Sequence, residues 1–421
     1  MRVKQRGIFR LIGPSAAFAL AAVLVMAGGS SAGQERRFAG SVNVGISTTL
    51  SGSIAQLGQG GLNGVQLAVE EINAKGGLLR KQVRVVSADD NATPATGSSN
   101  VRSMILDKKI RALFGPVSSA VAAAELQLTA EHKVPTFLHT SNDITLMTKR
   151  YTPYAFQVVP NTVMEPRAVA AFLKKHVTDR NLSVATFAPD YVFGRNTVTN
   201  FLQALKDLNV KFEVVNQQWP ALGAPNIAPQ LSSLIQSRPE VTFNVQFGGD
   251  LVNFTKQAAG FGFFKSTRIV AMYSLDPLTA LAPNAPKGGI AYSRAPFWAI
   301  KTPEMTRFVT KYRQRYKEWP NEWAILAYTA VQSWAHAVQS TKSFNSDKVA
   351  RFLPGKTVPT IRGPIKIRAC DHQAEVPHYV STIWDKPHPQ VKVPLWSPVV
   401  FIAKPSQIMI SCAESLKLRE S

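Results

Sequence analysis

Along most of the chain, short segments in which every second residue is apolar alternate with longer segments in which apolar residues recur every three or four positions. At positions 41–47 apolar residues occupy every second place, which is typical of a β-strand. Four apolar residues then recur at intervals of three and four, which places them on one helical face: Leu62, Val65, Val69 and Ile72. Lys75-Gly76-Gly77 ends that helix with a basic residue followed by glycine. This stretch is the first of several strand–turn–helix units.

The same unit recurs as far as about residue 290. Further strands are predicted at 83–88, 110–114, 134–138, 182–187, 210–215, 241–247 and 268–272. Helices are predicted between them at 101–106, 118–132, 166–176, 197–208, 227–236 and 251–261. Such alternation indicates an α/β protein with parallel sheets covered by helices. Two blocks of the pattern, 41–158 and 159–290, predict two doubly wound lobes. Two long helices follow at 304–318 and 322–340, and helical signals fade beyond Pro354.

The first 32 residues have the pattern of a secretory signal peptide. Four cations and no acid precede residue 11, an apolar run reaches residue 27, and Ser30-Ser31-Ala32 forms a small-residue cleavage pattern. The alternative is a membrane anchor, but the clean apolar run is shorter than the roughly 20 residues that a spanning helix needs. We therefore expect export to the periplasm and cleavage near Ala32.

The composition changes this picture in one respect, which is charge. The 421 residues include 48 Lys and Arg against 26 Asp and Glu, a net charge of +22, and 45% are hydrophobic. That apolar share excludes a disordered chain. The charge would suit nucleic acid, an acidic membrane surface or an acidic partner. Export argues against nucleic acid, and the stripe formed by Arg307, Lys311 and Arg315 is typical of a solvated helix face.

The two cysteines are Cys370 and Cys412. In an oxidising compartment such a pair predicts one disulfide, which would close the loop 371–411 and hold the C-terminal tail. A metal site is the alternative, because His372, His378 and His388 lie nearby. Their spacing matches no closed zinc pattern, so we expect no metal. Free thiols are the third possibility.

Motifs of known catalytic chemistry are missing from the chain. Gly58-Gln59-Gly60-Gly61 lacks the Lys-Ser/Thr ending of a phosphate-binding loop, and position 63 is Asn where a dinucleotide fingerprint has its third glycine. Gly-x-Ser-x-Gly and His-Glu-x-x-His do not occur. We therefore expect neither an enzyme nor a cofactor, with an exported enzyme kept as an alternative.

Polar side chains follow several predicted strands at the point where each strand ends. They are Ser118, Ser119, Thr140, Ser141 and Asn142 in the first block, and the segments 190–194 and 248–250 in the second. Each could simply cap a helix. Together they lie at the carboxyl edges of two parallel sheets, where α/β proteins bind ligands. The sequence thus predicts a small polar ligand held between two lobes.

Several motifs resemble the bacterial branched-chain amino-acid binding proteins, which are substrate-binding components of ABC transporters. The opening segments 50–58 and 64–77 carry the most specific likeness, and the following segments occur in the family's order: 89–94, 114–119, 190–194, 248–250 and 327–333. The resemblance covers about residues 41–385. It implies a type I periplasmic binding fold whose lobes are joined by a three-segment hinge near residues 158, 290 and 375. Lobe 1 would comprise 41–158 and 291–375, and lobe 2 would comprise 159–290 and 376–421 with the tail.

The resemblance also implies roles for single residues. Ser119, next to Ser118, would hold a ligand carboxylate, and Thr140 and Asn142, on either side of Ser141, would bind carboxylate or amine groups. Phe193 would cover the ligand from the second lobe. Three positions depart from the family: Leu57 replaces an aromatic wall residue, Asp250 lies where an aromatic is frequent, and Tyr273 lies near the place of the acid that receives a ligand ammonium. Asp250 or Asp276 could substitute for that acid.

The implied function is capture of a small organic solute by lobe closure. The ligand would be an amino acid or a related carboxylate or amide, and a monomer would deliver it to an inner-membrane ABC permease. The family also includes binders of amides, urea and aromatic acids. A ligand-sensing periplasmic regulator of the same fold is the alternative within this architecture.

Overall fold

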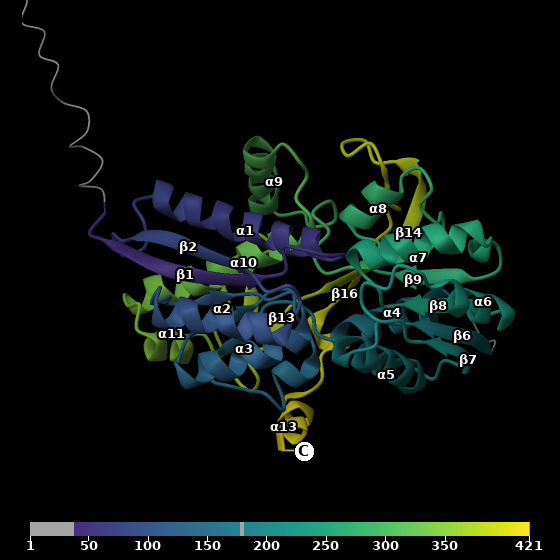
Figure 1. The fold of residues 1–421 in the computed structure, drawn as a ribbon, viewed down its shortest axis with the longest axis horizontal. Helices are drawn as coiled ribbons and strands as arrows, with labels where there is room; N and C mark the ends of the chain where they lie inside the picture. The colour runs from purple at the N-terminus through teal and green to yellow at the C-terminus, as the bar shows by residue number, and fades with distance from the viewer. Residues whose placement is uncertain (1–37, 177–180, 421) are drawn as a thin grey trace, which may run out of the picture. The chain divides into compact units, whose positions relative to one another are not determined.

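The first parallel sheet has five strands in the order β2-β1-β3-β4-β5. The computed structural model describes residues 38–176 and 181–420, so the predicted leader lies outside the described residues. The strands are β1 (Ser41–Thr48), β2 (Gln82–Asp89), β3 (Leu113–Phe114), β4 (Thr136–Leu138) and β5 (Ala155–Gln157). Around them lie α1 (Ala55–Ala74), α2 (Pro94–Leu106), α3 (Ser119–Glu131), α9 (Pro303–Tyr316), α10 (Glu322–Thr341) and α11 (Ser346–Phe352) (Figure 1). We call this group the first lobe.

The glycine-rich segment at residues 58–64 lies inside α1 and lets that helix pack closely on α10. A Cβ at Gly64 would lie 2.2 Å from the backbone oxygen of Ala324, and one at Gly60 would meet the side chain of Asn321. Only glycine permits this approach of two backbones. The segment is therefore a packing feature, as expected from its incomplete phosphate-binding motifs.

The second sheet repeats the topology of the first. Its parallel part runs β10-β9-β8-β6-β7, and β14 extends it in the antiparallel sense, followed by β15, with β16 also paired to β14. The strands are β6 (Leu182–Phe187), β7 (Phe212–Gln218), β8 (Val241–Asn244), β9 (Arg268–Ala271), β10 (Ile290–Ser293), β14 (His378–Pro387), β15 (Pro394–Trp396) and β16 (Phe401–Ala403). The helices are α4 (Met164–His176), α5 (Val192–Asp207), α6 (Ala228–Gln236), α7 (Gly248–Gly260) and α8 (Leu275–Leu281). We call this group the second lobe.

The chain passes between the two sheets three times, after β5, after β10 and before β14. The predicted α/β class with two doubly wound lobes and a three-segment hinge is thereby confirmed. A small antiparallel sheet of β11 (Thr357–Val358), β12 (Ile365–Ile367) and β13 (Ala374–Glu375) precedes the third crossing. Proteins of this class bind ligands at the carboxyl ends of such strands.

Two buried side chains tie the crossing segments to one another. The Arg362 guanidinium donates to the backbone oxygens of Val158 and Arg294, each at 3.1 Å, and so joins the first two crossings. Gln373 Nε2 donates to Val159 O at 2.8 Å, which joins the third crossing to the first. We call Arg362 and Gln373 the hinge clamp.

The C-terminal tail is held by the predicted disulfide. Cys370 and Cys412 are bonded, with their Cα atoms 5.8 Å apart. Two short helices occur where helical signals had faded, α12 (Pro405–Ile408) and α13 (Cys412–Glu420), and α13 is labelled beside the C-terminus in Figure 1. Ser415 Oγ of α13 donates to the buried Asp371 carboxylate at 2.9 Å. None of the helices in the described part of the chain combines the length and apolar character that a membrane crossing requires.

Candidate functional site

Side chains from the carboxyl ends of both sheets surround a small cavity of about 20 Å³. Its lining follows the strands in order, with Ser119 after β3, Thr140 and Asn142 after β4, Phe193 after β6 and Arg294 after β10. The other lining residues are Leu57, Val117, Tyr191, Phe247, Met272 and Trp323. Most of this surface is apolar, and the polar groups gather on the first-lobe side and at Arg294.

Ser119 begins α3 and is buried, with 2% of its surface exposed. Its Oγ accepts hydrogen bonds from the backbone N–H groups of Asn142 at 3.2 Å and Asp143 at 3.3 Å. A serine hydroxyl has two acceptor lone pairs and one proton. Both lone pairs are used here, so the proton is left to donate to an acceptor in the cavity. The α3 N-terminus also favours a negative charge at this place.

Thr140 and Asn142 are also buried at this end of the cavity. Thr140 Oγ1 lies 2.8 Å from His139 Nδ1, and burial lowers the pKa of His139 to about 3, so the imidazole is neutral. Asn142 Nδ2 donates to Pro160 O at 2.9 Å, which leaves the side-chain oxygen of Asn142 as an acceptor for other groups. The Asn142 oxygen can therefore accept a hydrogen bond from a ligand, and the Thr140 hydroxyl adds a second polar group at this end of the cavity.

Arg294 is the one cation among the described residues that line the cavity, and the sequence did not point to it. It is 3% exposed, pairs with the buried Glu165 of α4, and donates from Nη1 to Thr140 O at 2.7 Å. Burial raises the pKa of Glu165, against the opposing effect of Arg294. A guanidinium carries five N–H donors, more than these contacts use. The strand before Arg294, β10, is buried. The only sequence signal for Arg294 was therefore a charged residue directly after a core strand.

The second lobe contributes an aromatic wall. Phe193 and Phe247 meet edge to face with their ring centroids 5.5 Å apart, and Tyr191 lies 5.8 Å from Phe193. Burial raises the pKa of Tyr191, so its hydroxyl stays protonated. The Trp323 ring, 5.2 Å from the Arg294 guanidinium carbon, covers another side. This wall fits a flat or branched apolar ligand body.

Four of the predicted site residues do not line the cavity. Ser118 is the buried residue before α3, and Ser141 donates its backbone N–H to Pro116 O at 3.1 Å. Asp250 accepts from the Gly223 N–H at 2.7 Å, and the Tyr273 hydroxyl pairs with Thr255 Oγ1 at 2.8 Å. Among the described residues that line the cavity there is no carboxylate.

Hydrogen bonds across the mouth of the cavity join the two lobes. Gly249 N of α7 donates to Ser53 O at 3.0 Å, and Asn196 Nδ2 of α5 donates to Asp143 Oδ2 at 2.8 Å. Further along, Asn321 Nδ2 donates to Asp276 Oδ2 at 2.8 Å. These bonds hold the two lobes in contact around the cavity, and we infer that this is the closed form.

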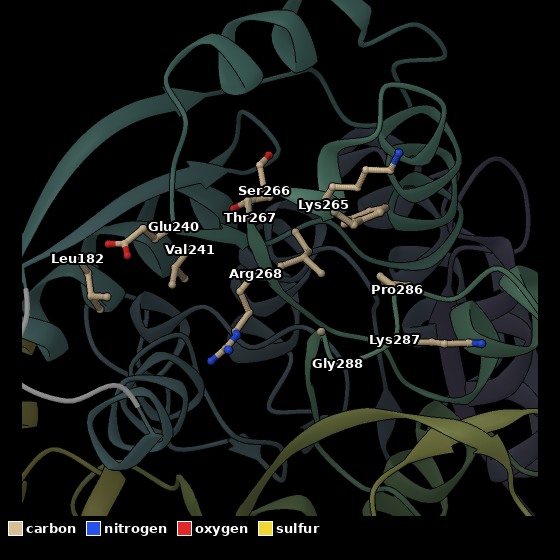
Figure 2. A pocket seen from close by; sticks show the side chains of 13 residues that line it. Leu182, Glu240, Val241, Lys265, Ser266, Thr267, Arg268, Pro286, Lys287 and Gly288 are labelled. Atoms are coloured by element: carbon tan, nitrogen blue, oxygen red, sulfur yellow. The ribbon is translucent and has the colours of Figure 1, made fainter.

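A second recess, at the opposite edge of the second sheet, is larger but differs in character. Figure 2 shows Leu182, Val241 and Arg268, which lie at the amino ends of β6, β8 and β9, together with Lys265 and Lys287. The described residues that line it all belong to the second lobe, so it is not a site shared by the two lobes. Within residues 38–176 and 181–420, no group of three His, Cys, Asp or Glu side chains could hold a metal ion.

Comparison with known proteins points to one family. A family model described as periplasmic binding protein matches residues 41–386. Leu/Ile/Val-binding protein homolog 7 of Brucella abortus (strain 2308) is 26% identical over 328 residues, covering 74% of this chain and 80% of that protein. A solute-binding protein of an ABC transporter from Rhodopseudomonas palustris BisB5, in complex with 3,4-dihydroxybenzoic acid, has a TM-score of 0.76 at 20% identity, covering 86% and 98% of the two chains. LivJ of Streptococcus pneumoniae, in complex with isoleucine, has a TM-score of 0.74 at 20% identity, covering 87% and 100%.

Proposed function

Because the chain belongs to the periplasmic binding protein family, we propose that it is the solute-binding component of an ABC transporter and captures a small organic acid. The acid enters between the open lobes and is enclosed when they close. The closed protein then delivers it, as a monomer, to a permease in the inner membrane. The predicted leader, with cleavage near Ala32, would bring the protein to the periplasm.

The observation that carries the choice of ligand is the chemistry of the cavity lining. The unused proton of Ser119, the α3 N-terminus and Arg294 all favour a carboxylate. A free amino acid would also bring an ammonium group, and burying that charge without a partner is costly. The described lining residues offer it no carboxylate, since the Asp250 side chain accepts from Gly223 instead. An acid without an ammonium group fits better.

The apolar part of the cavity supports an aromatic or branched body for this acid. Phe193, Phe247 and Trp323 present ring faces and edges, while Leu57 and Met272 fill the remaining sides. Benzoate-type acids suit such walls, because aromatic rings pack well edge to face. The structural neighbour from R. palustris was solved with an acid of this kind, and the neighbour from S. pneumoniae with an amino acid. We place the aromatic acid first and the branched-chain amino acid second.

A thermal-shift screen of the purified protein, followed by calorimetry, tests this order. The panel contains benzoate and its hydroxylated forms, the matched uncharged benzamides, and leucine, isoleucine and valine. A ligand at 100 times its dissociation constant adds about 2.7 kcal/mol to the free energy of unfolding, which is easily seen. We expect shifts with the benzoates and none with the benzamides. Shifts with the amino acids alone would reverse the order, and no shift with any compound would count against the solute-binding role.

A further inference from the structure

The turns that precede β2 and β3 carry five exposed cations: Arg80, Lys81, Lys108, Lys109 and Arg111. In the first sheet β2, β1 and β3 are neighbours, so these turns lie along one stretch of its amino edge. Neighbouring strands are about 4.8 Å apart, which makes this stretch about 10 Å wide. We call these five residues the basic edge.

Among the described residues, no carboxylate lies within ion-pair distance of the basic edge. Within the described residues none of the five cations forms an ion pair, and the one acid of the two turns, Asp107, accepts a hydrogen bond from Ser103 Oγ. Four of the cations, all but Arg80, line a common recess of about 230 Å³ together with Phe344. Cations gathered in this way attract a fixed array of negative charges.

Two exposed leucines flank these cations. Leu79 is 37% exposed beside Arg80, and Leu106 is 44% exposed at the end of α2, two residues before Lys108. Exposed apolar side chains next to Lys and Arg are typical of surfaces that bind anionic membranes, because the leucines enter the headgroup region while the cations contact phosphates. A soluble acidic peptide would gain little from two separated leucines.

We propose that the basic edge, with Leu79 and Leu106, binds the protein reversibly to an anionic phospholipid surface. The site would not interfere with ligand capture. The cavity lies at the carboxyl ends of the strands, and the eight residues of β1 separate the two edges by about 26 Å. Membrane contact at this edge would keep the binding protein near a membrane-embedded partner in both its open and its closed form.

Co-sedimentation with lipid vesicles tests the proposal. We expect the purified protein to bind vesicles of equal parts phosphatidylglycerol and phosphatidylcholine, and not vesicles of phosphatidylcholine alone. Binding should weaken as salt screens the charges. The triple variant Lys108→Gln, Lys109→Gln, Arg111→Gln should bind the anionic vesicles roughly 100-fold more weakly, since each basic residue near the surface contributes a factor of about five. Its thermal unfolding and its affinity for the cavity ligand should be unchanged.

The matched control removes three cations at the amino edge of the second sheet, Lys265→Gln, Arg268→Gln and Lys287→Gln (Figure 2). Both variants have the same net charge. Unchanged vesicle binding by this control supports the basic edge as the site, whereas an equal loss in both variants would show that net charge alone is responsible. A protein that binds soluble polyglutamate and not anionic vesicles would also overturn the proposal, in favour of an acidic protein partner.

The double variant Leu79→Ser, Leu106→Ser tests the apolar contribution separately. It should bind anionic vesicles at low salt and lose more affinity than the unaltered protein as salt rises. Identical salt curves for the two proteins would show that the leucines do not enter the headgroup region.

Discussion

Ser119 shows how a single residue can be prepared for a ligand before the ligand arrives. Two backbone N–H groups fix its oxygen and leave only its proton free. Since a hydrogen bond to a charged group is worth about 1.5–3 kcal/mol, a carboxylate ligand should depend strongly on this one hydroxyl.

Replacing this serine should therefore weaken binding of a carboxylate ligand. We expect Ser119→Ala to cost about 1–3 kcal/mol of binding free energy, measured by calorimetry with the best acid from the screen. Ser118→Ala is the matched control, because Ser118 is a neighbouring buried serine outside the cavity lining. Equal losses in both variants would indicate damage to the α3 N-terminus and not the loss of a ligand contact.

Asp276 makes the closed form sensitive to pH. Burial raises its pKa to about 7, against the Asn321 hydrogen bond and with a smaller upward effect from Glu322 and Glu318. If opening of the lobes exposes this carboxyl, its pKa returns toward the ordinary value of about 4. The closed form thus holds the proton more tightly, so closure is favoured as pH falls from about 7 and loses this contribution above it.

Ligand affinity should follow the same dependence. Between pH 8 and pH 6 we expect the dissociation constant to fall by up to about tenfold, since one pKa unit corresponds to about 1.4 kcal/mol. Titrations of the unaltered protein and of Asp276→Asn, which has no charge to lose, give the comparison. An identical pH dependence in both proteins would assign the effect to another group.

At the scale of elements, α7 packs closely against the segment before α1. The size of the residue at position 249 therefore determines how near the two lobes can come. A Cβ at Gly249 would lie 2.6 Å from the Ser53 backbone oxygen, which is nearer than real contacts allow. This contact joins the two lobes, so opening them would break it. A larger side chain here would therefore act on closure and not on either lobe by itself.

Gly249→Ala should bind ligand at least about tenfold more weakly while unfolding at nearly the same temperature, because its penalty of roughly 1–3 kcal/mol falls on the closed form. Small-angle scattering with saturating ligand should show a more open molecule than the unaltered protein. Gly260→Ala, also in α7 but with open space around its Cβ, is the control. A loss of thermal stability equal to the loss of affinity would show that the substitution damages the second lobe.

The sequence predicted most elements, because strands buried in a parallel sheet and helices with one apolar face leave clear periodicities. It placed the strand at 210–215, whereas β7 spans Phe212–Gln218, an edge strand whose mixed burial weakens the alternation. It also missed strands β5 and β10–β16 and helices α8, α11, α12 and α13, most of which are short. Their formation depends on tertiary contacts such as the Ser415–Asp371 hydrogen bond.

The candidate site was predictable in part for a similar reason. Ser119, Thr140, Asn142 and Phe193 follow strands, so topology alone brings them to the sheet edges. Arg294 and Trp323 belong to the segment after the second crossing, and their position depends on how the lobes associate. Asp250 follows a strand equally well, yet its carboxylate accepts from Gly223, a contact that no strand pattern reveals.

At the scale of the whole molecule, the disulfide adds a covalent link to a tail that also bonds to the segment around Cys370 and Asp371. Cys412 begins α13, whose burial is slight apart from Ser415. Closing a loop of this length stabilises a protein by about 2–4 kcal/mol, mainly by restricting the unfolded chain. The tail helix should therefore depend on the bond more than the two sheets do.

The paired variant Cys370→Ser, Cys412→Ser should unfold at a lower temperature, with a loss of about 2–4 kcal/mol. Hydrogen exchange should rise most in α13 and around Asp371, while ligand affinity should change little, because neither residue lines the cavity. A comparable loss of affinity would show that the tail also governs the lobes.

The hinge clamp has a consequence for how affinity is set. Arg362 and Gln373 bond the three crossing segments to one another, so we expect the lobes to turn about a common axis without sliding apart. Affinity then equals the intrinsic affinity of the closed form reduced by the fraction of time that the empty protein spends closed. Substitutions among the crossing segments would change the fraction of empty protein that is closed. They would thereby change the ligand concentration at which uptake is half-maximal, while the residues that line the cavity stay the same.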